Sequence, residues 1–400
     1  MNAAPGSQMT PSRRAPQNSG GIVGLFPELL GVGGVQEASR RTAHVLHNFS
    51  TRLHCPVNFL GLNDAPGVQE YLDGDATIAV RGFGRSKLRF VLAAMACARK
   101  NPRLVLAAHP NLAVPALWMK RFAPQLKIIV LAHGVDVWEP LSHSRHKALL
   151  AADLIMAPSS YTAKKLTEVQ SVPSPKIREL PWPLNEDVLQ ISESPSIIPL
   201  PKSFPSPPVI LTVGRWAASE RYKGADDLIH AVAHLRPAFP GLNLVAVGGG
   251  DDLPRLKKIA SDLNVSAAVH FLEGISRREL SACYARADIF ALPSTGEGFG
   301  FVFLEAMAFG KPLVGARAGG ATDLIEDGVN GLLVPPHDQG ALAQAIERLL
   351  RDDSLRATLG QKGAEIVRRK YRFEAFEKGL STILAECGLD VTGVDSGISA

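Results

Sequence analysis

Two glutamates, Glu297 and Glu305, stand eight positions apart in a stretch whose other residues suit an anionic ligand. The stretch leaves an apolar run, turns through three glycines (Gly296, Gly298 and Gly300) and enters a helical pattern. Backbone N–H groups at such a helix start can bind an anion, and carboxylates accept hydrogen bonds from sugar hydroxyls. At 1.5 Å per helical residue, the two acids would lie about 12 Å apart along the axis. This layout predicts a nucleotide sugar as the ligand, with partners for its ribose, its diphosphate and its hexose.

Two cations, Arg215 and Lys223, form a second candidate group in the loop that follows the apolar run at residues 209–213. Guanidinium and ammonium groups bind diphosphate oxygens and stabilise the charge that a diphosphate gains as a leaving group. The sequence Asp73-Gly74-Asp75 has the spacing of a metal-binding pair. It precedes an expected strand rather than following one, so we interpret it as a turn.

Alternating apolar runs and helical patterns must position these residues. They predict an α/β fold of two Rossmann-like, doubly wound domains that face each other across a cleft. Strands are expected at residues 21–26, 57–60, 77–80, 104–107, 127–132, 209–213, 244–247, 269–272, 289–292 and 312–316. Such sheets bind ligands beyond the carboxyl ends of their strands. Gly33 and Gly34 follow the first of these strands and His133 follows the fifth, so all three are expected at that edge.

The chain divides at a stretch with six prolines, which disfavour both helices and strands and are typical of a linker. The ends of the chain are polar and are expected to be tails, the first of them disordered. The expected order is a tail at 1–20, a first domain at 21–191, a linker at 192–208, a second domain at 209–372, a helix at 373–388 and a tail at 389–400.

The composition is that of a globular protein, with 400 residues of which 46% are hydrophobic and 20% charged. A net charge of +5 suits an anionic substrate or an acidic membrane surface, but the basic blocks typical of nucleic-acid binders are missing. The four cysteines are scattered, which favours a cytoplasmic setting over a disulfide framework or a zinc site. Because no apolar run of about 18 residues occurs, no membrane-spanning helix is expected.

A basic segment, with Arg81, Arg85, Lys87 and Arg89, leads into an apolar helical pattern at residues 91–98. Cations beside apolar residues can contact anionic lipid at a membrane surface. A solvated loop followed by a buried helix fits the same residues. Both interpretations stay open at this point.

The stretch from residue 297 to residue 312, Glu-Gly-Phe-Gly-x-x-x-Leu-Glu-Ala-Met-Ala-x-Gly-x-Pro, resembles a known signature. It is the signature of retaining nucleotide-sugar glycosyltransferases with the GT-B fold, in the group called family four, and the two glutamates match its E-x7-E motif. The resemblance implies transfer of a hexose to a hydroxyl of a glycan or of a lipid-linked acceptor. It also implies that the helix at 373–388 crosses back to the first domain. Many members of the family work in the cytoplasm, peripherally at the inner face of the membrane.

The resemblance also implies roles for single residues. Arg215 and Lys223 would bind the diphosphate in place of a divalent metal, so neither an essential metal nor a cofactor is expected. Glu297 would hold the hexose, Glu305 would hold the ribose, and His133 would reach the hexose from the first domain. The donor would further contact Gly33, Gly34, Gly274, Ile275, Gly298, Phe299 and Gly300.

Three other classes of protein stay open from the sequence. A nicotinamide oxidoreductase would share the doubly wound halves, but Gly248-Gly249-Gly250-Asp251 lacks the full glycine fingerprint that it needs. An epimerase or a phosphorylase fits the fold alone, and no motif marks the pyridoxal lysine of a phosphorylase. A nucleotide-sugar-binding protein without activity would use the same donor residues.

Overall fold

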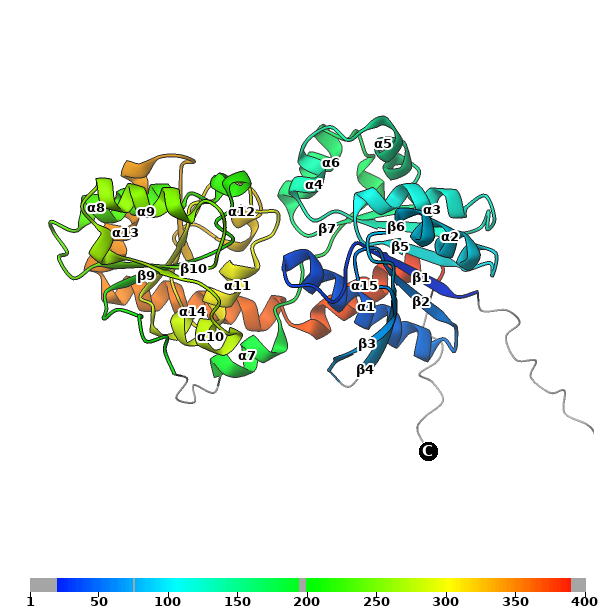
Figure 1. Ribbon diagram of the computed structural model, residues 1–400, viewed down its shortest axis with the longest axis horizontal. Helices are drawn as coiled ribbons and strands as arrows, with labels where there is room; N and C mark the ends of the chain where they lie inside the picture. Colours follow the sequence, from blue (N-terminus) through cyan, green and yellow to red (C-terminus); the bar gives the residue numbers. More distant parts are fainter. Residues whose placement is uncertain (1–19, 75, 194–198, 390–400) are drawn as a thin grey trace, which may run out of the picture.

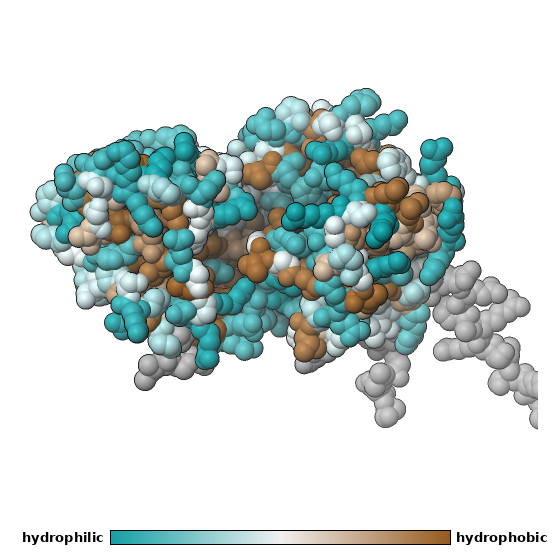
Figure 2. Space-filling model, in the orientation of Figure 1, coloured by the Kyte–Doolittle hydropathy of each residue, from teal (hydrophilic) through white to brown (hydrophobic). Residues whose placement is uncertain are grey.

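The computed structural model of the chain describes residues 20–74, 76–193 and 199–389. Two α/β domains lie side by side, each with a sheet between layers of helices (Figure 1). The space-filling view shows a hollow between them (Figure 2). Apart from Gly20 and Leu389, the expected tails lie outside the described residues. Leu389 was expected in the second tail, but it is buried against the core.

The first domain is built on an eight-stranded sheet with the order β3-β4-β2-β1-β5-β6-β7-β8. Neighbouring strands are parallel, except that β3 runs antiparallel to β4 at one edge. The strands are β1 (Ile22–Phe26), β2 (Val57–Gly61), β3 (Gly67–Asp73), β4 (Ala76–Gly82), β5 (Leu104–Ala107), β6 (Lys127–Leu131), β7 (Leu154–Ala157) and β8 (Ile177–Glu179). The helices are α1 (Gly34–Arg52), α2 (Lys87–Ala98), α3 (Ala113–Met119), α4 (Val135–Trp138), α5 (His143–Leu150), α6 (Ser160–Glu168) and α7 (Glu186–Glu193).

The second domain has a six-stranded parallel sheet with the order β11-β10-β9-β12-β13-β14. Its strands are β9 (Val209–Val213), β10 (Asn243–Val247), β11 (Val269–Leu272), β12 (Ile289–Leu292), β13 (Leu313–Ala316) and β14 (Gly331–Val334). The helices are α8 (Ala225–Leu235), α9 (Leu253–Asp262), α10 (Arg277–Arg286), α11 (Phe301–Ala308), α12 (Ala321–Leu324), α13 (Gln339–Arg351), α14 (Asp353–Lys370) and α15 (Phe373–Glu386). None of the helices in the described ranges combines the length and the apolar character that a membrane-spanning segment requires.

The prediction of two doubly wound α/β domains is confirmed. Strands β1, β5, β7, β9 and β12 are buried at every residue, because helices cover both faces of each sheet. Strands in that setting are continuous apolar runs, and such runs were the signal in the sequence.

Some details differ from the prediction. Helix α7 ends at Glu193, inside the expected linker, of which residues 194–198 lie outside the described part of the chain. The basic segment is not one loop, because Arg81 belongs to β4 whereas Lys87 and Arg89 belong to the first turn of α2. The antiparallel edge strand β3 was not predicted.

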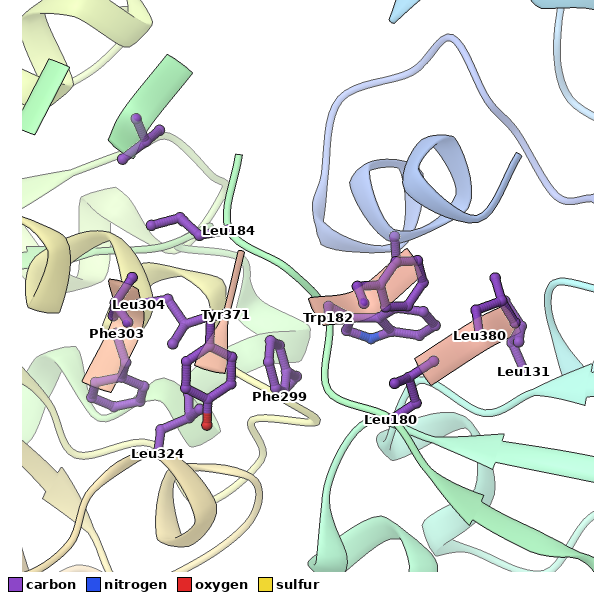
Figure 3. Packing of buried hydrophobic residues seen from close by; sticks show 14 of the residues in the cluster. Leu131, Leu180, Trp182, Leu184, Phe299, Phe303, Leu304, Leu324, Tyr371 and Leu380 are labelled. Atoms are coloured by element: carbon purple, nitrogen blue, oxygen red, sulfur yellow. The ribbon is translucent and has the colours of Figure 1, made fainter. Parts of the chain in front are cut away.

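Helix α15 follows the second domain in the chain but lies against the first (Figure 1). The ring of its Phe376 is 5.7 Å from the ring of Trp182, and Leu380 is fully buried. Figure 3 shows Trp182 between two groups of buried side chains, one with Leu380 and the other with Phe299 and Tyr371. One apolar core therefore runs through both domains and holds them together.

Candidate active site

The loop between β12 and α11 carries Glu297 and rests on the loop that follows β9. The N–H of Thr295 donates to the carbonyl of Tyr222 at 2.9 Å, and an added Cβ on Gly296 would overlap the Tyr222 ring. Gly300, with φ 99°, ends the loop immediately before α11. Since helical geometry begins only after Gly300, the predicted separation of about 12 Å along one helix axis is wrong. Glu297 is a loop residue.

Four charged side chains meet beside this loop. Lys223 Nζ lies 2.6 Å from Glu297 Oε1 and 3.8 Å from Glu220 Oε2, while Arg215 pairs with the other oxygen of Glu220. The side chains of Lys223, Glu220 and Glu297 are 13%, 10% and 14% exposed, whereas that of Arg215 is 74% exposed. The structure thus brings Arg215, Lys223 and Glu297 together around Glu220, a residue that the sequence reasoning did not single out.

Glu305 lies on α11 and binds to α10. Its Oε2 accepts a hydrogen bond from the Tyr284 hydroxyl at 2.7 Å. Burial raises the pKa of the Glu305 carboxyl, and the Tyr284 hydrogen bond and the charge of Arg277 oppose this only in part. Burial also raises the pKa of the Tyr284 hydroxyl. The exposed helix residue that a bland interpretation of Glu305 would expect is therefore not what the fold shows.

His133 directly follows β6, and two neighbours fix its position. Its Nε2 donates to the carbonyl of Ala108 at 2.7 Å, an assignment that follows because a carbonyl oxygen only accepts. Its ring stacks on Trp182 with the centroids 5.6 Å apart. Asp136 accepts hydrogen bonds from the backbone N–H groups of His133 and Gly134, the shortest at 2.7 Å. Asp136 therefore holds the turn that places His133.

The two domains touch where the His133 turn meets the Glu297 loop. An added Cβ on Gly134 would overlap the Cα of Gly298, and one on Gly298 would overlap the carbonyl oxygen of His133. Ser159 Oγ, at the start of α6, donates to the carbonyl of Gly298 at 3.2 Å. Only glycines allow the two backbones to come this close. This contact places His133 next to the loop that carries Glu297.

The glycine turn after β1 reaches the same region. Gly33, with φ 148°, precedes α1, and an added Cβ on Gly34 would lie 3.2 Å from Phe301 in α11. The side chain of Phe299 is only 4% exposed and belongs to the core. This leaves the backbone of Phe299, together with that of Gly300, for the predicted hexose contact.

The turn after β11 holds Gly274 and Ile275. Gly274 has φ 66°, and an added Cβ there would meet no atom within 4 Å, so this backbone faces open space. Ile275 packs partly against the core. Ser276 and Glu279 then form a capping box that starts α10, so the turn is held in place by its own hydrogen bonds.

No group of three or more metal-binding side chains occurs within the described residues. Asp73, the first acid of Asp73-Gly74-Asp75, ends β3 and pairs with Arg41 at 2.6 Å. Asp75 lies outside the described residues. Asp73 thus has a structural partner in the first domain.

Known proteins resemble this chain in sequence. Residues 197–366 match the family described as glycosyl transferases group 1. A GDP-mannose-dependent alpha-(1-6)-phosphatidylinositol monomannoside mannosyltransferase of Mycolicibacterium smegmatis is 33% identical over 259 residues, which are 61% of this chain and 66% of the relative. A D-inositol 3-phosphate glycosyltransferase of Corynebacterium jeikeium is 41% identical over 160 residues, which are 38% of each chain. The matched segments thus cover less than two thirds of these relatives.

The solved structure of sucrose-phosphate synthase from Thermosynechococcus elongatus has the same fold. It superposes with a TM-score of 0.74 at 23% identity, over 92% of this chain and 98% of that chain. The match includes both domains and the arrangement of their sheets. By the sequence match in its second domain and by its GT-B fold, the chain belongs to the group 1 glycosyl transferases.

Proposed function

We propose that the protein transfers a hexose from a nucleoside diphosphate sugar to a hydroxyl of a glycan or of a lipid-linked acceptor. The observation that carries this proposal is the cluster of Arg215, Lys223, Glu220 and Glu297, which lies where the His133 turn of the other domain makes contact. The names of the two relatives, a mannosyltransferase and a glycosyltransferase, support the same class of reaction.

In this proposal the diphosphate binds between the two cations. Lys223 is only 13% exposed, so its charge acts in a medium of low dielectric constant, where it is worth more than in water. A diphosphate would replace Glu297 as the partner of Lys223 and Glu220 as the partner of Arg215. The released Glu297 carboxylate would then accept hydrogen bonds from the hexose, while Glu305 would accept them from the ribose.

We further propose that the reaction retains the configuration of the sugar, with attack on the face that the diphosphate leaves. The bond from the anomeric carbon to the phosphate oxygen breaks, and the acceptor oxygen bonds to that carbon. The acceptor proton passes to the leaving phosphate, whose negative charge Arg215 and Lys223 stabilise. Glu297 stabilises positive charge on the sugar ring, and His133 orients the hexose. This route uses neither a metal nor a cofactor.

Alanine variants of Arg215, Lys223 and Glu297 test these roles. Each change should lower turnover of the donor by about 100- to 1000-fold, as the loss of a group that stabilises developing charge does in other enzymes. Lys258→Ala, on the surface of α9, is the matched control and should keep wild-type turnover. Wild-type donor binding and turnover in all three variants would show that the roles are assigned to the wrong residues.

The donor can be identified by thermal unfolding with a panel of nucleotide sugars that begins with GDP-mannose and UDP-glucose. A ligand present at 100 times its Kd adds about 2.7 kcal/mol to the free energy of unfolding. Product analysis with the stabilising donor then separates the alternatives. An epimerase would convert the sugar without an acceptor, and a binding protein would convert nothing.

We also propose that the protein works in the cytoplasm, peripherally at the inner face of the membrane. Arg81, Arg85, Lys87 and Arg89 are all exposed, and Leu88 between them is 72% exposed. The relative from Mycolicibacterium smegmatis is named for a phosphatidylinositol-based acceptor, which is a lipid. Cations beside exposed apolar side chains are typical of proteins that bind the membrane surface.

Replacing all four of these cations by Ser should weaken binding to vesicles that contain anionic lipid by on the order of 100-fold or more, since each cation near such a surface contributes about 1 kcal/mol. Cosedimentation with phosphatidylserine vesicles measures the effect. The control replaces four exposed cations elsewhere by Ser, namely Lys257, Lys258, Arg351 and Lys362. Equal loss of binding in both proteins would mean that overall charge, not this segment, attracts the membrane.

A further inference from the structure

The sheet edge formed by β3 and β4 leaves one of its faces bare. Val68 and Leu72 of β3 are 70% and 77% exposed, and their partners in register, Arg81 and Thr77 of β4, are exposed as well. Figure 1 draws this hairpin at the border of the first domain, beyond the helices that cover the other strands. Sheets of this class normally carry helices on both faces, so the bare face calls for a reason.

An open groove lies between this bare face and α2, and we call it the α2–β4 groove. The part lined by Arg89 and Leu92 has a volume of about 440 Å³, and the part that reaches Lys100 has a volume of about 290 Å³. Arg81 and Ala96 line both parts, so the two are continuous. With twelve residues, α2 gives the groove a length of about 18 Å.

The walls of the groove are apolar and carry cations. Arg81 and Arg89 stand at the end where β4 finishes, and Lys100 stands at the opposite end. Among the described residues, no Asp or Glu lines either part. Glu70 lies on the same face of β3, opposite Ala79, but outside the lining. A ligand with an apolar body and a negative head would match this distribution.

An alkyl chain fits these walls better than a peptide. The unpaired backbone groups of β3 lie along its outer edge and not on the sheet face, so they cannot pair with a peptide in the groove. A peptide would leave its own N–H and C=O groups without partners against apolar side chains, which is costly. An alkyl chain has no such groups. Leu88 and Leu92, 72% and 60% exposed, continue the apolar surface out of the groove (Figure 2).

We propose that the α2–β4 groove binds one alkyl chain of an anionic membrane phospholipid, with the lipid phosphate at Arg81 and Arg89. This turns the membrane contact proposed above from a charged surface into a site for a single lipid, and it does not depend on glycosyl transfer. One alkyl chain alone gives an association constant of only about 10⁴ M⁻¹, so stable attachment needs a second signal. The groove and the basic residues at its end would supply the two signals together.

Monomeric dodecyl phosphate, kept below its critical micelle concentration, is the probe for this site. Calorimetry should show that it binds, and that dodecyl maltoside binds about fivefold more weakly for each cation contact that it lacks. Inorganic phosphate should show no saturable binding at the same concentrations. Equal binding of inorganic phosphate would mean a simple anion site and would overturn the proposal.

Ala96→Trp fills the groove from an exposed position on α2 and should lower the affinity for dodecyl phosphate by at least about tenfold. Ala357→Trp, at an exposed position on α14, is the matched control and should bind the probe as the wild type does. Arg81→Ser combined with Arg89→Ser should reduce the binding of dodecyl phosphate to that of dodecyl maltoside, while binding of the maltoside stays the same. These arms separate the apolar contact from the charged contact.

Cys97 lines the groove and supplies a readout that needs no variant of the walls. In Cys387→Ser protein it is the one partly exposed thiol of the chain, since Cys55 and Cys283 are buried. Dodecyl phosphate should slow the labelling of Cys97 by a thiol reagent in proportion to the fraction of protein bound, whereas inorganic phosphate should not. An unchanged labelling rate at saturation, or wild-type affinity in Ala96→Trp protein, would place the lipid elsewhere. Either result would overturn the proposal.

Discussion

Glu220 contacts both cations of the proposed diphosphate site, yet only the cations could be singled out from the sequence. Arg215 and Lys223 are predictable because they flank one loop after an apolar strand. Glu220 stands in that loop between Ser219 and Arg221, and charged loop residues of this kind are usually solvated. The loop coils into a short 3₁₀ segment, Ala218–Lys223, which turns Glu220 inward. Its burial depends on this coil, which no spacing in the sequence reveals.

Glu220→Gln should tighten the binding of the nucleoside diphosphate, because the phosphate then no longer competes with a carboxylate for Arg215. The gain should be at most about fivefold, since an ion pair whose arginine is largely exposed is worth up to about 1 kcal/mol. Calorimetric titration of both proteins with GDP and UDP measures it. Glu347→Gln, which breaks a surface pair with Arg351, is the control and should leave the affinity unchanged. Weaker binding in Glu220→Gln protein would show instead that the carboxylate holds the cations in place.

At the scale of elements, the sequence is informative where a strand is buried on both faces and uninformative where it is not. The strands β5 and β12 are apolar throughout, and both were predicted. In β3, exposed and half-buried residues alternate, with Val68, Glu70 and Leu72 facing outward. Its only partner in the sheet is β4, so no second neighbour requires an apolar residue at these positions. The bare face that suggests a lipid site is therefore a property of the structure, not of the sequence.

Glu37 shows how a helix can be tied to a distant segment by one charge. In α1, its carboxylate pairs with Arg40 at 2.7 Å and Arg41 at 2.8 Å, and it accepts a hydrogen bond from Asn185 at 3.0 Å. Burial disfavours the charged form, but Arg41 and Arg40 outweigh it and lower the pKa of Glu37 from 4.5 to about 2. The folded protein thus binds this proton less tightly than the unfolded chain. Its contribution to stability is complete above about pH 4.5 and is lost as the pH falls towards 2.

Glu37→Gln should therefore lower the free energy of unfolding by on the order of 3 kcal/mol at pH 7. The loss should shrink as the pH falls from 4.5 towards 2, because the wild-type carboxylate is then protonated as well. Urea unfolding of both proteins at pH 7 and pH 3 measures the difference. The control Glu347→Gln should change stability by less than about 0.5 kcal/mol at both pH values. A loss that is the same at both pH values would mean that shape, not charge, explains the effect of Glu37.

At the scale of the whole molecule, catalysis depends on how the two domains meet. His133 and Glu297 could each be predicted from their own half of the chain, but their proximity could not, because it comes from the packing of Gly134 on Gly298. A second contact supports the first, since Ser160 Oγ donates to Asp323 at 2.7 Å across the same boundary. Both contacts join loops or helix starts at the carboxyl edges of the two sheets. The interdomain core around Trp182 keeps those edges opposed (Figure 3).

Gly298→Ala tests whether this close approach is needed for the chemistry. The added methyl group would overlap the carbonyl oxygen of His133, so the His133 turn and the Glu297 loop must move apart. Glycosyl transfer should fall by about 100-fold, because a displacement of about 1 Å between reacting groups has that effect. The nucleoside diphosphate should still bind as in the wild type, because Arg215 and Lys223 both belong to the second domain. Gly340→Ala, where an added Cβ would lie 3.4 Å from Asp338, is the control and should keep both properties. A parallel loss of transfer and of diphosphate binding would place the defect inside the second domain, and wild-type transfer would show that the glycine contact is dispensable.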